Sequence, residues 1–334
     1  MGADMKQARY ATRGPVPQDV IEAVACEVPA LGPGQALVEV LAAPINPSDL
    51  LTLTGQYGIL PPLPAVGGNE GVGRVLALAD GVSTPALGRT VLLPIGGGTW
   101  ATHVVADARS LTPLPDDADP VQLSMITVNP PTARLLLSEF VDLEPGEWVI
   151  QNAANSAVGG YLVQLAALRG LKTLNVVRRE SAREDVLALG ADAVLVDGDD
   201  LAKRVREATG GAKIRLGVDA VGGLATERLA QCLGEGGVVV NYGAMSGEPC
   251  AMSPASLVFR DVALRGFWLA RWYRNAPSEQ RAALFGELAG LIAQGKLHAR
   301  VQATYGIDRI KQAVAAAAAG ERAGKIVLIP NAGA

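Results

Sequence analysis

The stretch WVIQNAANSAVGGYLVQLAALRGLKTLNVVRR, residues 148–179, decides the fold of this chain. An apolar run that ends at Ile150 predicts a buried strand, and a turn of small residues follows it. A helical pattern then covers residues 158–169, and a second apolar run predicts a strand over residues 173–177. The stretch therefore predicts a βαβ unit, whose first turn lets backbone N–H groups and a helix N-terminus approach a pyrophosphate.

The second strand of this unit ends in Arg178 and Arg179, where an enzyme that uses NAD usually carries an acid for the ribose 2′-hydroxyl. Arginine suits a 2′-phosphate instead, which indicates NADPH. Ala157 stands where a glycine is expected, and Gly159 and Gly160 follow it. A ligand-free βαβ turn and a solvated arginine pair remain alternatives, but turn and arginines together, at a spacing of roughly 20 residues, favour a dinucleotide.

The composition is that of an ordinary globular protein. A length of 334 residues suggests two domains, and 49% hydrophobic and 19% charged residues give an ample core. The net charge of −4 gives no support for a nucleic-acid or anionic-membrane partner. The start of the chain, MGADMKQARY, lacks a signal-peptide core, and no apolar run reaches the roughly 18 residues of a membrane span. With three scattered cysteines read as reduced thiols, we expect a cytoplasmic protein.

The pattern of predicted secondary structure changes near residue 118. Short apolar or alternating runs between Pro and Gly signals make residues 1–118 β-rich, whereas strand-like and helical runs alternate after a helical segment at 120–141. That alternation predicts an α/β protein with a doubly wound parallel sheet of Rossmann type. We expect this sheet in residues 119–272, inserted into a β-rich domain of residues 1–118 and 273–334, with nicotinamide and substrate between the two domains. Further expected strands are 36–41, 73–78, 89–93, 100–105, 193–196, 216–220, 238–242, 263–267 and 325–329, and further expected helices are 279–295 and 307–319.

The residues that could bind a metal are few. The chain has two histidines, His103 and His298, and no CxxC pair, whereas zinc needs three or four ligands at compatible spacing. A Ser-His-Asp triad also has little support, because the sequence contains no GxSxG motif. We therefore expect no metal site.

Several segments of the chain resemble the zinc-free medium-chain dehydrogenase/reductases, and more narrowly the mitochondrial-type trans-2-enoyl-thioester reductases. They are INPSDLLTLTGQYGILPPLPAVGGNEGVGRV (45–75), GTWATHVV (98–105), NAANSAVG (152–159), NVVR ending at Arg178, YGAMSGEP from Tyr242 and FWLARW from Phe267. Zinc-binding relatives carry a His before the Glu of GGNEG, and this chain has Asn69 there. The resemblance implies a GroES-like fold for the β-rich domain, a homodimer, and NADPH-dependent reduction of an enoyl thioester of coenzyme A or acyl carrier protein.

The resemblance also implies which residues act. Tyr57 matches the catalytic tyrosine of the family. The family often has a second arginine two positions after Arg178, whereas this chain has Glu180, an acid close to the expected 2′-phosphate. The cofactor positions carry over onto Asn129, Asn155, Ser156, Ala157, Val158, Arg178, Arg179, Tyr242, Gly243, Ala244, Met245, Phe267, Trp268, Leu269 and Lys325.

Tyr57 suits this reduction on chemical grounds. Hydride addition to the β-carbon of an enoyl thioester develops negative charge on the thioester oxygen, and one donor aimed at that oxygen lowers the barrier by on the order of 3 kcal/mol. A phenol is neutral at pH 7, donates a hydrogen bond and can pass a proton to the α-carbon. The alternative is a tyrosine that packs against the prolines of its own loop.

An aromatic and basic segment follows residue 266. Phe267, Trp268 and Trp272, with Arg271 and Arg274, either line the nicotinamide and acyl channel, with an arginine at the carrier phosphate, or belong to a subunit interface or the core. Two rival functions remain: a quinone oxidoreductase of the same superfamily, and an NADPH-binding protein without turnover. The GQYG and FWLARW segments favour the thioester reductase.

Overall fold

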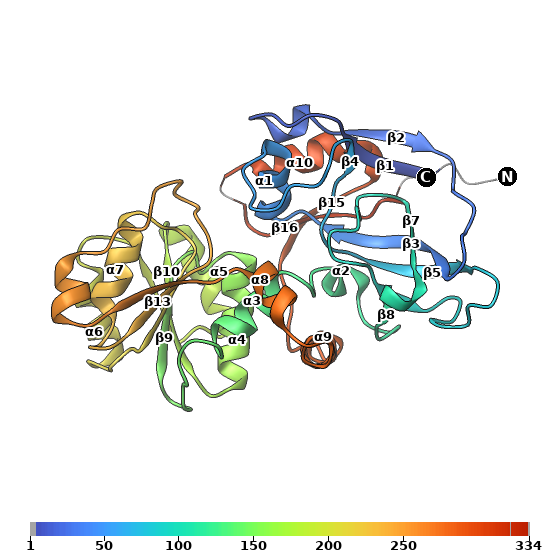
Figure 1. Cartoon of the computed structure of the whole chain (residues 1–334). Coiled ribbons are helices and arrows are strands. Elements are labelled where there is room, and N and C mark those ends of the chain that lie inside the picture. Colours follow the sequence, from blue (N-terminus) through green and yellow to red (C-terminus); the bar gives the residue numbers. More distant parts are fainter. Residues whose placement is uncertain (1–4, 321, 333–334) are drawn as a thin grey trace. The chain divides into compact units, whose positions relative to one another are not determined.

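The structure, a computed structural model, describes residues 5–320 and 322–332 (Figure 1). Two compact units divide the chain: Met1–Val128 with Phe285–Ala334, and Asn129–Leu284. The boundaries therefore differ from the expected ones at 118/119 and 272/273. Helix α2 (Pro120–Leu123) stays with the first unit, because the Gln122 side-chain amide exchanges two hydrogen bonds, 3.0 and 2.8 Å long, with the backbone of Ala299.

The second unit confirms the doubly wound parallel sheet. Its six strands lie in the order β11-β10-β9-β12-β13-β14, and every pairing between them is parallel. The sequence order reverses between β9 and β12, the switch point at which open α/β sheets bind ligands at the carboxyl ends of the strands. The strands are β9 (Trp148–Gln151), β10 (Lys172–Val177), β11 (Ala193–Val196), β12 (Leu216–Asp219), β13 (Val238–Asn241) and β14 (Ala263–Gly266).

Helices connect these strands and bury their apolar side chains. Ile150, Leu174 and Val239 belong to one apolar cluster and are completely buried, which explains why the strands read as nearly continuous apolar runs. The helices of this unit are α3 (Asn129–Leu136), α4 (Ala157–Leu168), α5 (Arg183–Leu187), α6 (Leu201–Thr209), α7 (Leu224–Cys232) and α8 (Leu269–Asn275), with short helices η3 (Glu180–Ala182) and η4 (Ala255–Phe259).

The first unit is β-rich. A seven-stranded sheet has the order β15-β16-β3-β5-β6-β8, with β7 also paired to β3, and a three-stranded sheet has the order β2-β1-β4. Every second side chain of β3 is buried from Ala36 to Ala42, as expected for a strand with one face on a core. The strands are β1 (Met5–Tyr10), β2 (Glu22–Cys26), β3 (Gln35–Pro44), β4 (Ala65–Val66), β5 (Val72–Leu78), β6 (Thr90–Leu92), β7 (His103–Asp107), β8 (Thr112–Pro113), β15 (Val301–Tyr305) and β16 (Lys325–Leu328).

The C-terminal segment completes this unit, as the discontinuous arrangement predicted. Strand β16 pairs antiparallel with β3, and Ile326 and Leu328 join the same apolar core as Val38 and Val40. The remaining helices are α1 (Pro47–Thr54), α9 (Ser278–Ala293), which spans the boundary between the units, α10 (Ile310–Ala318), and the short η1 (Pro17–Asp19), η2 (Ala108–Ser110) and η5 (Ile307–Arg309).

Two expected elements differ from those observed. The helix expected over residues 120–141 is two helices, because Pro130 and Pro131 lack the N–H groups that a continuous helix requires, whereas both fit the first turn of α3. The strand expected over 100–105 begins only at His103. In the described part of the chain, no helix has both the length and the apolar character needed to cross a membrane.

Candidate active site and cofactor site

The turn between β9 and α4 is built for close approach. Ser156 caps α4, and its hydroxyl accepts a hydrogen bond from the Gly159 amide at 3.1 Å. A Cβ on Gly159 would lie 2.5 Å from the carbonyl oxygen of Ala154, so only glycine allows the turn to pack this tightly. Ala157 needs no glycine, because it is the first residue of the helix and the left-handed residue of the turn is Ala153, with φ 47°.

A buried carboxylate at the end of β12 organises the carboxyl edge of the sheet. Asp219 is completely buried, and Asn152 after β9 donates to its Oδ1 at 2.6 Å. Asn241 at the end of β13 donates to its Oδ2 at 3.0 Å. Three further donors complete the shell: the backbone amides of Val221 and Gly222 at 2.9 and 3.1 Å, and the Thr226 hydroxyl at 2.7 Å.

These hydrogen bonds explain the charge state of Asp219. Burial alone would raise its pKa, but the donors, Asn152 foremost, hold the pKa below the ordinary value for an aspartate. The carboxylate therefore stays ionised and ties together the loops that follow β9, β12 and β13. Sequence reasoning missed Asp219, because a lone acid after an apolar strand has no distinctive spacing.

The loop after β13 carries four of the predicted cofactor residues, Tyr242–Met245. The Asn241 side chain donates to the Gly243 carbonyl at 2.8 Å, and a Cβ on Gly243 would meet the Ala220 carbonyl oxygen at 2.8 Å. The Ser156 side chain lies close enough to the Tyr242 phenol to influence its pKa, so this loop lies near the turn after β9. Burial raises the pKa of Tyr242, and the nearby Ser156 hydroxyl opposes that rise. Of the predicted cofactor residues in these two loops, Ser156 and Tyr242 are thus brought together.

The end of β10 is positively charged, as the sequence predicted. Arg178 is exposed and Arg179 half-buried, and η3 begins directly after them. Glu180, the acid that departs from the family pattern, pairs with Arg183 at 2.5 Å. The two arginines therefore lie at the carboxyl end of a strand that neighbours β9, on the side of the sheet where the turn also lies.

The aromatic and basic segment forms the rim of a hollow of about 390 Å³ in the second unit. Phe140 and Phe267 pack edge to face with centroids 6.0 Å apart, and Arg265 lies 5.2 Å from the Phe140 ring. Arg274 stacks 5.3 Å from the Trp268 ring. Aromatic rings and arginines face an open hollow, which fits a channel lining and also fits a subunit interface. Its lining comprises Glu139, Phe140, Arg265, Gly266, Phe267, Trp268, Arg271, Trp272, Asn275, Ala276 and Gln280.

Tyr57 lies in the first unit, in a loop fixed at both ends. Helix α1 ends at Gly55, which takes the left-handed conformation (φ 80°), and the Tyr57 amide donates to the Leu51 carbonyl at 3.2 Å. Four residues later, the Pro61 carbonyl accepts a hydrogen bond from Arg13 Nη2 at 2.5 Å. The half-buried Tyr57 side chain is therefore carried by a loop of defined backbone.

The start of α1 rests on a buried cluster of charges. Asp49 closes a capping box with Asn46, and its Oδ1 accepts a 2.7 Å bond from Asn69, the residue at the place of the zinc-binding histidine. Asn46 in turn donates to Glu70 at 2.7 Å and accepts a bond from Lys325 Nζ at 2.5 Å. Lys325, expected at the cofactor, therefore has its ammonium within the first unit, bonded to the segment that leads into α1, the helix before the Tyr57 loop.

Burial dominates the titration of this cluster. It raises the pKa of Asp49 to about 6, against the opposing effect of the Asn46 hydrogen bond. It also raises the pKa of Glu70 and lowers that of Lys325, while the attraction between these two opposite charges works against both shifts. The capping box of α1 thus lies within a buried cluster in which burial and charge attraction shift the pKa values in opposite directions.

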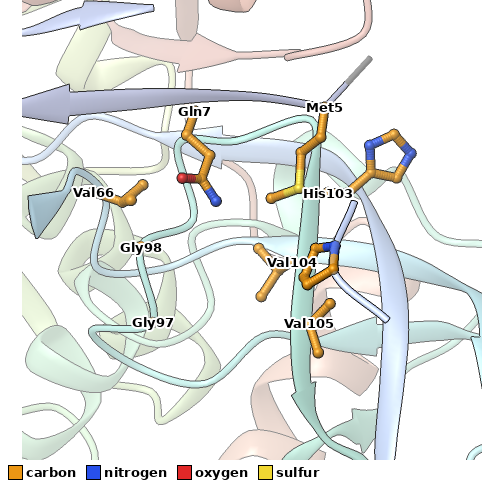
Figure 2. A pocket seen from close by; sticks show the side chains of 9 residues that line it. Met5, Gln7, Val66, Gly97, Gly98, His103, Val104 and Val105 are labelled. Atoms are coloured by element: carbon orange, nitrogen blue, oxygen red, sulfur yellow. The ribbon is translucent and has the colours of Figure 1, made fainter. Parts of the chain in front are cut away.

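A smaller hollow, of about 180 Å³, lies elsewhere in the first unit (Figure 2). Figure 2 shows Met5, Gln7 and Val66 around it, together with the strand that carries His103. None of the predicted site residues lines it. His103 contacts Thr102 Oγ1 at 3.0 Å, and burial lowers the pKa of its imidazole.

Comparison with known proteins decides the family. A model described as an alcohol dehydrogenase GroES-like domain matches residues 32–116, and one described as a zinc-binding dehydrogenase matches residues 157–284. The mitochondrial enoyl-[acyl-carrier-protein] reductase of Rattus norvegicus is 38% identical over 306 residues, which cover 90% of this chain and 82% of that protein.

The chain belongs to the mitochondrial-type enoyl-thioester reductases.

Solved structures agree with this family. The complex of Etr1p with NADP and crotonyl-CoA is 25% identical, with a TM-score of 0.88 over 98% of this chain and 99% of that one. A mycobacterial quinone oxidoreductase is 26% identical, with a TM-score of 0.83 over 98% of this chain and 100% of that one. The overall fold is thus shared with the rival activity, and the distinction rests on the identity to the enoyl-thioester reductases.

Although one matching family model is described as zinc-binding, residues 5–320 and 322–332 hold no group of three His, Cys, Asp or Glu side chains placed to bind a metal. Asn69 donates hydrogen bonds to Asp49 Oδ1 from both its side-chain and its backbone nitrogen. This departure from zinc-binding relatives agrees with membership of the zinc-free enoyl-thioester reductases.

Proposed function

We propose that this protein reduces the C2–C3 double bond of trans-2-enoyl thioesters with NADPH, and that Tyr57 donates the hydrogen bond and the proton. The observation that carries the proposal is the 38% identity, over 90% of the chain, to an enoyl-[acyl-carrier-protein] reductase. The neighbour Etr1p, whose complex holds NADP and crotonyl-CoA, supports the cofactor and the thioester.

The residues of the second unit fit a dinucleotide phosphate. The turn after β9 has the tight Gly159 packing that lets a backbone approach a pyrophosphate, and Ser156 begins a twelve-residue helix whose N-terminus favours anions. Arg178 and Arg179 supply donors for a 2′-phosphate. When bound, NADPH supplies the hydride. The chain's own part is to orient the nucleotide at the switch point of the sheet, through loops held by Asp219.

Tyr57 would act on the oxygen of the thioester. Its phenol donates toward the oxygen on which negative charge develops, and it can then deliver a proton to the α-carbon. Hydrogen bonds to the Leu51 and Pro61 carbonyls hold the backbone of its loop. Little backbone entropy is therefore lost when the phenol takes one position. We assign Lys325 and Asp49 a supporting part, because they hold the start of α1.

The thioester carrier is coenzyme A or acyl carrier protein. Both present a phosphopantetheine arm, and the hollow beside α8 offers aromatic rings with Arg265 and Arg271 on its rim. Arginine forks suit phosphate oxygens. We therefore propose that this hollow receives the arm of the carrier.

We also propose a homodimer joined through the edge of the six-stranded sheet. Strand β14 is the last strand of that sheet, and all four of its residues are exposed. The neighbouring short helix η4 exposes Val258 and Phe259 to 70% and 81%. An unpaired edge strand beside exposed apolar side chains suits pairing with a second copy.

One assay separates the candidate functions. NADPH absorbance is followed with crotonyl-CoA and, separately, with a quinone, and the acyl product is identified by mass spectrometry. Oxidation with formation of butyryl-CoA supports the proposal. Oxidation with the quinone alone would replace it by the quinone oxidoreductase, and binding of NADPH without oxidation would favour a non-catalytic protein.

A further inference from the structure

The carboxylate of Glu180 lies where a 2′-phosphate site needs positive charge. It follows Arg178 and Arg179 directly and opens the short helix η3 at the end of β10. A phosphate monoester carries a charge of about −1.5 to −2 at neutral pH, so a free carboxylate beside it is repulsive. The negative charge of Glu180 must therefore be compensated by a nearby cation if the end of β10 is to bind NADPH.

Arg183 meets this need. One 3₁₀ turn brings residues i and i+3 above one another, and Arg183 Nη1 donates to Glu180 Oε1 at 2.5 Å. Ala182, between them, is buried against the apolar cluster of β10 and β11 and fixes the turn. Arg183 Nε is buried without a hydrogen-bond partner among the described residues, so Glu180 is the group that holds this guanidinium.

A second acid near the end of β10, Asp197, is also paired with an arginine. The Asp197 amide donates to the Val177 carbonyl at 2.8 Å, which places Asp197 beside the last residue of β10. Both of its carboxylate oxygens accept bonds from Arg228, at 2.7 and 2.6 Å. Each of these two carboxylates, Glu180 and Asp197, is therefore compensated by an arginine of its own, Arg183 and Arg228.

We propose that Arg183 is a specificity-determining residue for the 2′-phosphate of NADPH: it pairs with Glu180 and so keeps that carboxylate from repelling the phosphate. The inference rests on the proposed use of NADPH. Arg183 acts here as a positioning residue, through Glu180, and not as a ligand of the phosphate. Because the side chains are 41% and 71% exposed, the pair contributes little to folding, and its variants remain folded.

The test measures binding rather than turnover. Calorimetric titration of the full chain with adenosine 2′,5′-bisphosphate and with 5′-AMP isolates the contribution of the 2′-phosphate. For Arg183→Ala we expect affinity for the bisphosphate to fall by about fivefold at low salt, with less than about a twofold change for AMP. Arg109→Ala removes the same charge from an exposed ion pair in the first unit, and it serves as the control without effect on either ligand.

A double variant decides how Arg183 acts. Glu180→Gln removes the repulsive group, so Glu180→Gln combined with Arg183→Ala is expected to bind the bisphosphate as tightly as Glu180→Gln alone. A double variant as weak as Arg183→Ala would overturn the inference, because Arg183 would then contact the phosphate itself. Equal losses for both nucleotides, or none, would also overturn it. A wild-type protein that binds both ligands equally would refute the proposed NADPH use as well, whereas a preference for the bisphosphate with an unaffected Arg183→Ala would refute the inference alone.

Discussion

Replacing Asp219 by asparagine tests whether one buried carboxylate holds together the loops that follow β9, β12 and β13. Two donors converge on its Oδ2, the Thr226 hydroxyl and the Asn241 amide, and three converge on Oδ1. An asparagine can replace only one oxygen as an acceptor, so its NH₂ group faces at least two donors. A hydrogen bond to a charged group contributes about 1.5–3 kcal/mol, so the loss of two predicts a destabilisation of about 3–6 kcal/mol.

The pH dependence of this loss has a definite sign. The folded-state pKa of Asp219 lies below its ordinary value, so the carboxylate contributes stability above the unfolded pKa, and the contribution is lost as pH falls through the folded pKa. The gap in unfolding free energy between wild type and Asp219→Asn is therefore largest near neutral pH and narrows in acid, below about pH 4.

The assay is urea unfolding at pH 7 and at a series of acidic pH values, with thermal unfolding beside it. For a domain of this size, the expected loss lowers the melting temperature of the second unit by about 10 °C. Asp200→Asn is the matched control, because that carboxylate is 65% exposed in a surface pair with Arg204, and its loss costs less than about 1 kcal/mol. An effect of Asp219→Asn no larger than that of the control, or a gap that does not change with pH, would refute the reasoning.

Two further predictions concern packing and assembly. Gly159→Ala places a methyl group 2.5 Å from the Ala154 carbonyl oxygen, so we expect about 1–3 kcal/mol of destabilisation and weaker NADPH binding in fluorescence titration. Gly160→Ala meets only the mobile end of the Leu189 side chain, at 3.1 Å, and serves as the tolerated control; equal effects would contradict the packing argument. Phe259→Glu places a charge on the exposed patch beside β14, and light scattering is expected to show monomers in place of dimers, whereas an unchanged mass would argue against this interface.

Periodic features of the sequence were sufficient to predict the fold. The apolar runs around residues 150, 174 and 239 predicted buried parallel strands, and the structure confirms them as interior strands of the sheet. The return of the last strand to the first domain was also predicted from the order of elements, and β16 confirms it. The domain boundaries were less accurate, because the side chain of Gln122 binds a segment 177 residues away.

The candidate site was predictable only where neighbouring residues carry the signal. The turn at Asn155–Val158 and the arginines after β10 are local patterns. The hydrogen bonds of Lys325 to Ile45 and Asn46 join residues that are 280 and 279 positions apart. Such contacts cannot be predicted from patterns among neighbouring residues. The substitution of Ala157 for glycine was harmless because the left-handed residue of the turn lies elsewhere. The cytoplasmic location stays a prediction, although the relatives are described as mitochondrial.

The central claim is that Tyr57 supplies the hydrogen bond and the proton for reduction of an enoyl thioester. Its most direct test is the rate of NADPH oxidation with crotonyl-CoA in wild type and Tyr57→Phe, with the dissociation constant for NADPH measured on both proteins. The account predicts that turnover falls by at least about tenfold in the variant while NADPH binds equally well. Turnover that is unchanged in Tyr57→Phe would contradict the account.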